Sequence, residues 1–338
     1  MKKVVVLVAL LVVLVVAAAL LFSKGGTGAF AAGKPERLVI ASTADWAPDG
    51  LLFVAKEKGF FEGVDVEIPI IASTDARRTA FLAGQIDGYA TTLDEWVITA
   101  AHASAHGMGG KAVIQLDESA GADGILAKND IASVRDFVGK RVAAEKGFAS
   151  YALLRDALER NGLSVDDVDF VSMSGADAGA AFVAGGLDVA ATWEPWLSKA
   201  VEANAGHVVW TSANSSGVIQ DVIPVRAEAL AQRPGAVKAL MRGLFAAMDY
   251  FKEHPDEASE IIARNMGLTV EDVKATIAGN RLPSYEEQRQ FFGAPGARAP
   301  AHELFDKISR WWKAEDIIDA QPSAAEFIEQ QAMAELYG

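Results

Sequence analysis

One thirteen-residue pattern occurs twice in this chain, at a constant separation of 101 residues. It reads TAFLAGQIDGYAT at residues 79–91 and AAFVAGGLDVAAT at residues 180–192, and seven of the thirteen positions are identical. A serine also precedes each copy in the same register, Ser73 and Ser174. A supersecondary unit that occurs twice predicts two lobes of similar build, and two facing lobes predict a cleft between them.

The repeated part of the pattern is interpreted as scaffold: a helix, the glycine that ends it and the strand that follows. Gly84 and Gly185 occupy the position of a left-handed helix cap, which glycine adopts without strain. Asp87 and Asp188 are interpreted as turn residues, because aspartate is favoured in turns. The segments that follow the two copies differ, TLDEW against WEPW, so the site is expected there.

Short apolar runs alternate with amphipathic stretches around both copies, which is typical of an α/β fold. Each lobe is predicted to have the order β-α-β-α-β. In the first lobe we expect strands at 38–41, 64–71 and 86–91 and helices at 51–58 and 75–83. In the second we expect strands at 142–144, 168–173 and 187–192 and helices at 150–161 and 176–184.

A chain of 338 residues, about half of them apolar, is long enough for two domains. The apolar segments Gly124–Lys128 and Ile219–Pro224 are interpreted as two hinge crossings. Lobe one is then expected at 36–125 and lobe two at 126–220, and residues 221–338 are expected to return to lobe one. The helical periodicity beyond Arg226 predicts C-terminal helices that pack on lobe one.

The N-terminus is predicted to be a signal peptide, residues 1–31. Lys2 and Lys3 are followed by nineteen apolar residues, 4–22, and then by the Ala-Phe-Ala that ends at Ala31. The length of the apolar run leaves a retained membrane anchor as the alternative. Either reading places the body of the protein outside the cytoplasm, in the periplasm, and the absence of cysteine excludes disulfides and a cysteine-linked lipid anchor.

The charge of the remaining chain argues against some partners. Without residues 1–31, 28 basic residues face 45 acidic ones, a net charge of −17. Nucleic acid and anionic lipid surfaces are therefore not expected to bind.

In open α/β sheets, ligands bind outside the carboxyl ends of the strands. This rule nominates the loops after the predicted strands, together with Asp221: 42–49, 72–75, 91–96, 145–150, 172–177 and 193–196.

The segment 145–151 passes from strand to helix through a glycine, and the free N–H groups of the helix start can hold an anion. Ser150 there is either a donor to the ligand or an ordinary helix cap. Arg77 and Arg78 either reach an anionic ligand or have a solvated or sheet-facing role. His102 and His106, four residues apart, lack a third metal ligand, so no metal and no cofactor are expected.

Aromatic and acidic residues gather in the nominated loops. Aromatic side chains can form the walls of a ligand site, and core packing is the alternative, which we prefer for Trp96 but not for Trp193. Several carboxylates in one cleft would suit an ammonium or amidinium group. For Asp94 and Asp123 helix capping is the alternative, and for Glu95 a solvated surface. The aromatic set is Trp46, Trp96, Phe148, Trp193 and Trp196, and the acidic set is Asp94, Glu95, Asp123, Glu194 and Asp221.

Enzyme signatures are missing from the sequence. It has no G-x-S-x-G, no H-E-x-x-H, no cysteine nucleophile and no G-x-G-x-x-G after a strand. A binding protein is therefore expected rather than an enzyme.

Several segments, in this order, resemble the periplasmic solute-binding proteins of nitrate/sulfonate/taurine-type ABC importers, a group that includes binding proteins for thiamine pyrimidine precursors. They are GFFEGVDVEI, AFLAGQIDG, ADGILAKNDIASVRDFVGKRVAAEKG, DAGAAFVAGGLDVAATWEPW and RPGAVKALMRGLFAAMDYFKEHPDEA. The resemblance implies a type II periplasmic-binding-protein fold, with two α/β lobes, two hinge crossings and a cleft that closes on the ligand. It also implies ligand contacts from Trp46, Thr91, Asp94, Asp123, Ser150, Trp193, Glu194 and Asp221, and we add Phe148 beside them.

Two departures bear on the ligand. The loop ADWAPDG retains Trp46 and Pro48 but lacks the Asn-His stretch of pyrimidine-precursor binders, which disfavours that ligand. Ser150 stands alone where oxyanion binders often have a Ser/Thr cluster, so nitrate or a simple sulfonate is less expected than a zwitterion or an amine.

The sequence therefore predicts a monomeric extracytoplasmic receptor that delivers a small polar ligand (sulfonate or taurine-like, zwitterion or amine) to the permease of an ABC importer. Two alternatives remain open. A pyrimidine-synthase-like enzyme on the same fold would need a reactive His or Cys in the cleft. A membrane-tethered sensor domain would need residues 4–22 to be retained.

Overall fold

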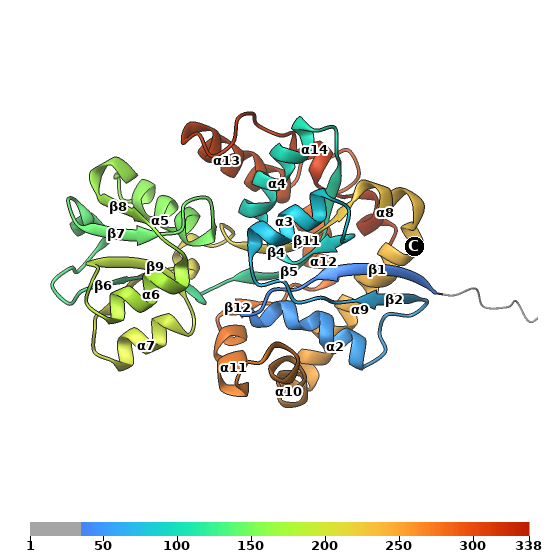
Figure 1. The fold of residues 1–338 in the computed structure, drawn as a ribbon, viewed down its shortest axis with the longest axis horizontal. Coiled ribbons are helices and arrows are strands. Elements are labelled where there is room, and N and C mark those ends of the chain that lie inside the picture. The colour runs from blue at the N-terminus through green and yellow to red at the C-terminus, as the bar shows by residue number, and fades with distance from the viewer. Residues whose placement is uncertain (1–34, 338) are drawn as a thin grey trace, which may run out of the picture. The chain divides into compact units, whose positions relative to one another are not determined.

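A computed structural model describes residues 35–337 of the chain. The predicted signal peptide, residues 1–31, lies outside the described residues. Residues 36–337 form one compact unit with two sheets (Figure 1). Within residues 35–337, no helix is both long enough and apolar enough to cross a membrane.

Lobe one is built on a seven-stranded sheet in the order β12-β5-β11-β3-β1-β2, with β4 paired to β11. Strands β1, β2 and β3 run parallel, whereas β5 and β11 are antiparallel to each other. Its first strands and helices are β1 (Glu36–Ala41), α2 (Leu51–Glu57), β2 (Val64–Glu67), α3 (Thr74–Leu82), β3 (Gly88–Tyr89), β4 (Thr91–Thr92), α4 (Leu93–Ala105) and β5 (Gly110–Ser119).

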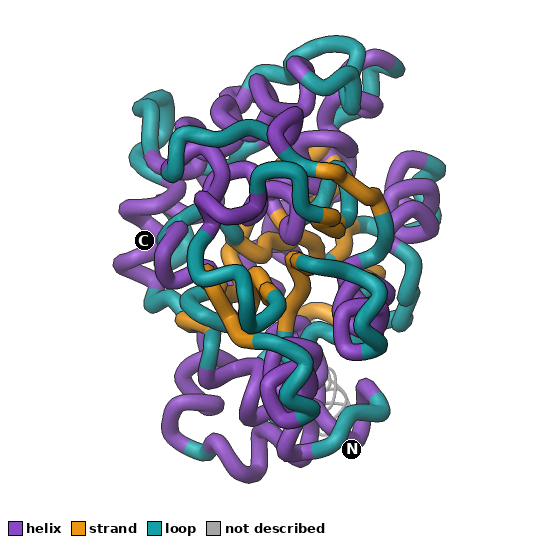
Figure 2. Tube along the Cα trace, turned by 90° about the vertical axis from the view of Figure 1, so that its left-hand side faces the viewer, coloured by secondary structure: helices purple, strands orange, loops and turns teal. Residues whose placement is uncertain are grey.

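Lobe two is built on a five-stranded sheet in the order β10-β6-β9-β7-β8. Its elements are β6 (Asp123–Ala127), β7 (Arg141–Ala144), α5 (Ala149–Arg160), β8 (Asp169–Ser172), α6 (Gly175–Val183), β9 (Val189–Trp193), α7 (Trp196–Glu202) and β10 (His207–Thr211). The predicted β-α-β-α-β order is therefore present in both lobes. Helices lie on both sides of the strands (Figure 2).

The chain returns to lobe one through β11 (Gln220–Arg226) and continues almost entirely as helices. These elements are α8 (Ala227–Gln232), α9 (Pro234–Glu253), α10 (Pro255–Met266), α11 (Val270–Ala278), β12 (Asn280–Arg281), α12 (Tyr285–Phe292), α13 (Pro300–Ala314), α14 (Ala324–Phe327) and α15 (Gln331–Ala334). The long helix α9 packs on α2 and on strands of the first sheet, as predicted.

The C-terminal helices do not pack on lobe one alone. Helix α13 packs on α4 of lobe one but also reaches α5 of lobe two. The rings of Tyr151 and Trp312 stack with centroids 5.9 Å apart, and Lys307 pairs with Asp156 at 2.9 Å. The larger hydrophobic core is accordingly continuous from lobe one to the α5 side of the second sheet, whereas the α6–α7 side has a core of its own.

The doubled pattern has the same structure in both lobes. Ser73 caps α3 and Ser174 caps α6, and in each case the serine hydroxyl accepts a hydrogen bond from the backbone N–H three residues on. Gly84 and Gly185 follow these helices with φ of 72° and 83°, the left-handed conformation that was predicted. Both phenylalanines of the pattern are buried, as expected for packing residues.

The two aspartates of the pattern do more than form turns. Asp87 accepts a hydrogen bond from the N–H of Val39 in β1 at 2.9 Å, and Asp188 accepts one from the N–H of Arg141 in β7 at 3.1 Å. Each carboxylate therefore ties the repeated unit to the first strand of the β-α-β-α-β unit in its own lobe. The interpretation as turn residues missed this role, because the partner lies 47 or 48 residues away in the sequence.

The crossings between the sheets lie just before the segments that were predicted as hinges. Gly124–Lys128 lies almost wholly in β6 and Ile219–Pro224 almost wholly in β11, so both segments are paired in sheets. The chain crosses at residues 120–122 and 216–219, between those strands and the preceding elements. The expected lobe boundary at residues 125/126 falls inside β6.

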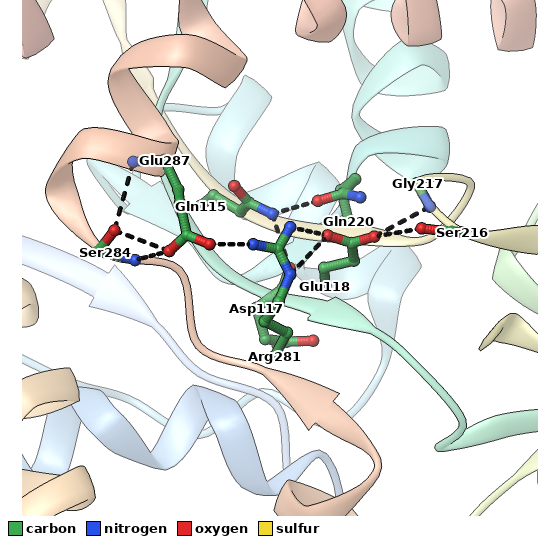
Figure 3. A network of polar contacts seen from close by, with 9 residues as sticks. All are labelled: Gln115, Asp117, Glu118, Ser216, Gly217, Gln220, Arg281, Ser284 and Glu287. Atoms are coloured by element: carbon green, nitrogen blue, oxygen red, sulfur yellow. Dashed lines mark hydrogen bonds and ion pairs between the residues drawn. The ribbon is translucent and has the colours of Figure 1, made fainter.

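A buried acid organises the polar network beside these crossings (Figure 3). The Glu118 carboxylate, 6% exposed, accepts hydrogen bonds from the hydroxyl of Ser216 at 3.2 Å and from the N–H of Gly217 at 3.0 Å. It also pairs with Arg281 of β12, which in turn pairs with Glu287 at 2.5 Å. The Glu118 carboxylate therefore joins the end of β5 to residues 216–217 of the second crossing, and hydrogen bonds and an ion pair compensate its buried charge.

Candidate functional site

A cavity of about 410 Å³ opens between the loops at the carboxyl ends of the strands. Every loop nominated from the sequence contributes to its wall, so the cavity lies where the strand-end rule expects a ligand to bind. The polar lining residues of lobe one are Thr43, Asp45, Asp49, Ser73, Thr74, Asp75, Arg77, Thr91, Thr92, Glu95 and Asp221. Those of lobe two are Asp123, Glu145, Ser150 and Ser174.

The structure brings seven of the nine predicted site residues into this lining. They come from four of the strand-end loops and from the two strands that follow the crossings. The seven are Trp46, Thr91, Asp123, Phe148, Ser150, Trp193 and Asp221. The other two, Asp94 and Glu194, do not line the cavity.

Glu194 was predicted to contact the ligand because it lies between two tryptophans. Its carboxylate instead accepts hydrogen bonds from the N–H of Ser198 at 3.1 Å and from the Ser198 hydroxyl at 3.0 Å. It therefore satisfies the first turn of α7, where helix N–H groups lack intrahelical partners. The prediction for Glu194 is not supported by this geometry.

Asp94 is buried in the first turn of α4 rather than exposed to the cavity. Its side chain is 1% exposed, and Thr92 rather than Asp94 is the N-cap residue. Burial raises the pKa of its carboxyl to about 7. The next residue, Glu95, takes the place in the cavity wall that was predicted for Asp94.

The interpretation of Glu95 as a solvated surface residue is wrong. Its side chain is fully buried and accepts hydrogen bonds from Arg78 at 2.8 Å, Tyr89 at 3.0 Å and Thr91 at 2.8 Å. A fourth bond comes from Thr99 at 2.9 Å. These partners fix the wall around Thr91 and neutralise Arg78, so neither charge is left for a ligand.

Arg77, the only basic residue among the described lining residues, is also occupied. It is 4% exposed, and its guanidinium donates to the carbonyls of Ile71 at 2.6 Å and Ala72 at 3.0 Å and to the Thr74 hydroxyl at 2.9 Å. The side chain therefore braces the loop between β2 and α3. The role observed for Arg77 is therefore structural rather than a contact with an anionic ligand.

The lobe-two wall begins at the start of α5. Ser150 is not the cap of this helix, because the N-cap residue is Phe148, and the Ser150 hydroxyl accepts a hydrogen bond from the N–H of Glu145 at 3.1 Å. The Glu145 carboxylate accepts one from the N–H of Gly175 at 3.3 Å, at the start of α6. Burial raises the pKa of Glu145, and the Gly175 N–H partly offsets this.

The tryptophans divide between cavity and core. Trp46 and Trp193 line the cavity, and the indole N–H of Trp46 donates to Asp117 at 3.3 Å. Trp96 is fully buried and donates to the carbonyl of Phe327 at 2.9 Å, which confirms the core interpretation. Trp196 is absent from the lining and packs against α6.

Four buried aspartates lie in or behind the cavity wall. Asp117 and Asp221 are direct partners across β5 and β11, and both are at most 3% exposed. Burial, reinforced by the neighbouring acids, raises the pKa of each well above its usual value. Burial also raises the pKa of Asp49 and of Asp123 to about 6.

Asp49 and Asp117 were not predicted as site residues. Asp49 lies in a nominated loop, so its position was available from the sequence. Asp117 lies near the end of β5, and only the strand register places it opposite Asp221. The sequence did hold one indication of this pair. Asp117 ends one apolar run and Asp221 interrupts another, and an acid in such a run is unusual unless it has a function or a partner.

The described residues contain no group of three or more metal-ligating side chains. His102 and His106 are exposed on α4 and its end.

Two α/β lobes, two crossings and a cavity between the strand ends define a periplasmic-binding-protein fold. The alkanesulfonate-binding protein SsuA from Xanthomonas axonopodis pv. citri, solved with MOPS bound, has this fold with a TM-score of 0.70. The two share 20% identity over 88% of this chain and 99% of that one.

The chain belongs to the family described as NMT1/THI5 like, which matches residues 50–258. It is 28% identical over 252 residues to a candidate binding protein of Brucella abortus (strain 2308), covering 72% of this chain and 76% of the relative. A candidate aliphatic sulfonates-binding protein of Escherichia coli (strain K12) is 32% identical over 169 residues, covering 47% of this chain and 50% of the relative.

Proposed function

We propose that this protein is an extracytoplasmic solute receptor that binds a small polar ligand between its lobes and delivers it to the permease of an ABC importer. The observation that carries the proposal is the cavity itself. Its volume of about 410 Å³ falls in the range of small-molecule sites, and both lobes contribute polar and aromatic walls. Closure of the lobes would bury the ligand, as in hinge-closing proteins.

The names of the relatives support the same function. All three of those named above are binding proteins, and two of the three are named for sulfonates. The periplasm is the compartment we infer, with residues 1–31 as the export signal, because such a receptor must meet its ligand before the permease does.

The test is a ligand screen with a chemical readout. Purified protein is heated with taurine, other sulfonates, amines and pyrimidines, and each compound is then recovered and its mass determined. A receptor gains thermal stability with its ligand by mass action and returns it unchanged. Stabilisation by no compound at millimolar concentration would count against the proposal, and a changed mass would indicate an enzyme.

A further inference from the structure

We propose that the ligand carries a positively charged nitrogen, an ammonium or amidinium group, held between the carboxylates of Asp123 and Asp221. The inference rests on the proposed function, since it names the ligand class of the same cavity. Asp123 is the first residue of β6 in lobe two, and Asp221 is the second residue of β11 in lobe one. Both line the cavity beside the crossings, one from each lobe.

Both carboxylates are buried without a counter-charge. Asp123 and Asp221 are each 3% exposed, and the Oδ2 atom of each is buried with no hydrogen-bond partner among residues 35–337. Neither forms an ion pair with a lysine, arginine or histidine of this part of the chain. A buried carboxylate is stable when a cation or several donors reach it, so an organic cation would supply what these two lack.

The rest of the cavity has the same polarity. Seven charged lining residues are acidic and one is basic, although two of the acids, Asp75 and Glu95, are already paired with Arg78. The acids are Asp45, Asp49, Asp75, Glu95, Asp123, Glu145 and Asp221.

Several of the donors that a sulfonate or nitrate could use are already occupied by the protein. Arg78 is held by Glu95 at 2.8 Å, and one terminal nitrogen of Arg77 donates to two backbone carbonyls, while its Nε is buried without a partner among residues 35–337. At the start of α6, the N–H of Gly175 donates to the carboxylate of Glu145. Helix starts of this kind attract oxyanions, and here a side chain of the protein takes that place.

The aromatic walls suit the same ligand. Trp46 and Trp193 reach the cavity from opposite lobes, with Phe148 beside the start of α5. The hydrogen bond from the indole N–H of Trp46 to Asp117 fixes the edge of that ring. Aromatic faces attract organic cations.

The experiment compares size-matched ions on wild-type protein and three variants. The probes are ethylammonium, methylguanidinium, tetramethylammonium and benzamidinium chlorides against sodium ethanesulfonate and benzenesulfonate, read by thermal shift and calorimetry. We expect at least one cation, and neither sulfonate, to stabilise the wild-type protein. Asp123→Asn and Asp221→Asn should each lower the affinity for that cation by about 100-fold, because each removes one charge of a buried pair.

The matched control is Asp319→Asn, which removes the same charge from an exposed site and should leave binding unchanged. Stabilisation by a sulfonate and by no cation would overturn the inference while leaving the receptor function intact. Equal affinities for the cation in all three variants would also overturn it. Failure of all probes, together with failure of the broader solute screen, would remove both the inference and the proposed function.

Discussion

Replacing Asp123 by asparagine is expected to stabilise the unliganded protein at pH 8 and to change its stability little at pH 4. Burial raises the pKa of this carboxyl from 3.8 to about 6, an effect that a hydrogen bond with Ser119 only partly offsets. A carboxyl whose folded-state pKa exceeds its unfolded-state pKa lowers stability as the pH rises between the two values. The wild-type protein should therefore lose stability from about pH 4 to about pH 7, and the variant should lose less.

The size of the effect follows from the shift. A pKa rise of about two units corresponds to about 3 kcal/mol above pH 7, and the substitution should recover up to that amount. For a folded unit of this size, that is about 5 °C in the unfolding midpoint. The charge on Asp123 also raises the pKa of Asp94, Asp117 and Asp221, so its removal relieves those groups as well.

The assay is urea and thermal unfolding of the wild type, Asp123→Asn and the exposed control Asp319→Asn from pH 4 to pH 9. The difference between the first two should grow with pH, and the control should follow the wild type throughout. A variant that is less stable than the wild type at pH 8, or a difference that does not depend on pH, would refute the reasoning. With a bound organic cation the order should reverse, because the ligand stabilises only the protein that retains the charge.

Two further substitutions test the scaffold around the site. In Gly175→Ala, an ideal Cβ would lie 1.9 Å from the ring of Trp193, so the indole must move; ligand affinity should fall about tenfold while Gly235→Ala, which meets nothing within 4 Å, leaves it unchanged. Unchanged affinity in the first variant would exclude Trp193 from the ligand wall. Asp87→Asn should cost about 1–3 kcal/mol of unfolding free energy and Asp188→Asn less than about 1, because the side chain of Asp87 is 16% exposed and that of Asp188 33%. Equal losses in urea unfolding would contradict that ranking.

The two-lobed architecture could be predicted from the sequence because the same thirteen-residue pattern occurs in both lobes. The two copies of the helix–glycine–strand unit occur in equivalent places in both lobes, and Gly84 and Gly185 have the backbone conformation that their positions indicated. The hinge segments were placed a few residues late, because an apolar run is the same signal in a crossing and in a strand. Only the pairing of β6 and β11 within their sheets distinguishes the two.

The sequence predicted which loops form the cavity but not which side chains of those loops line it. The strand-end rule gives the position of a loop and not the direction of a side chain. It therefore could not tell that Glu194 turns to α7, or that Glu95 rather than its neighbour Asp94 faces the cavity. Asp117 depends on strand register, and the partners of Glu95 come from four separate positions in the chain.

The most direct test of the central claim is native mass spectrometry of the purified protein, followed by identification of the molecule released from the cleft. We predict a small compound with a basic nitrogen that is bound by the wild type and by Asp319→Asn but is lost from Asp123→Asn and Asp221→Asn. A sulfonate or nitrate without a basic nitrogen, retained by all four proteins, would contradict it.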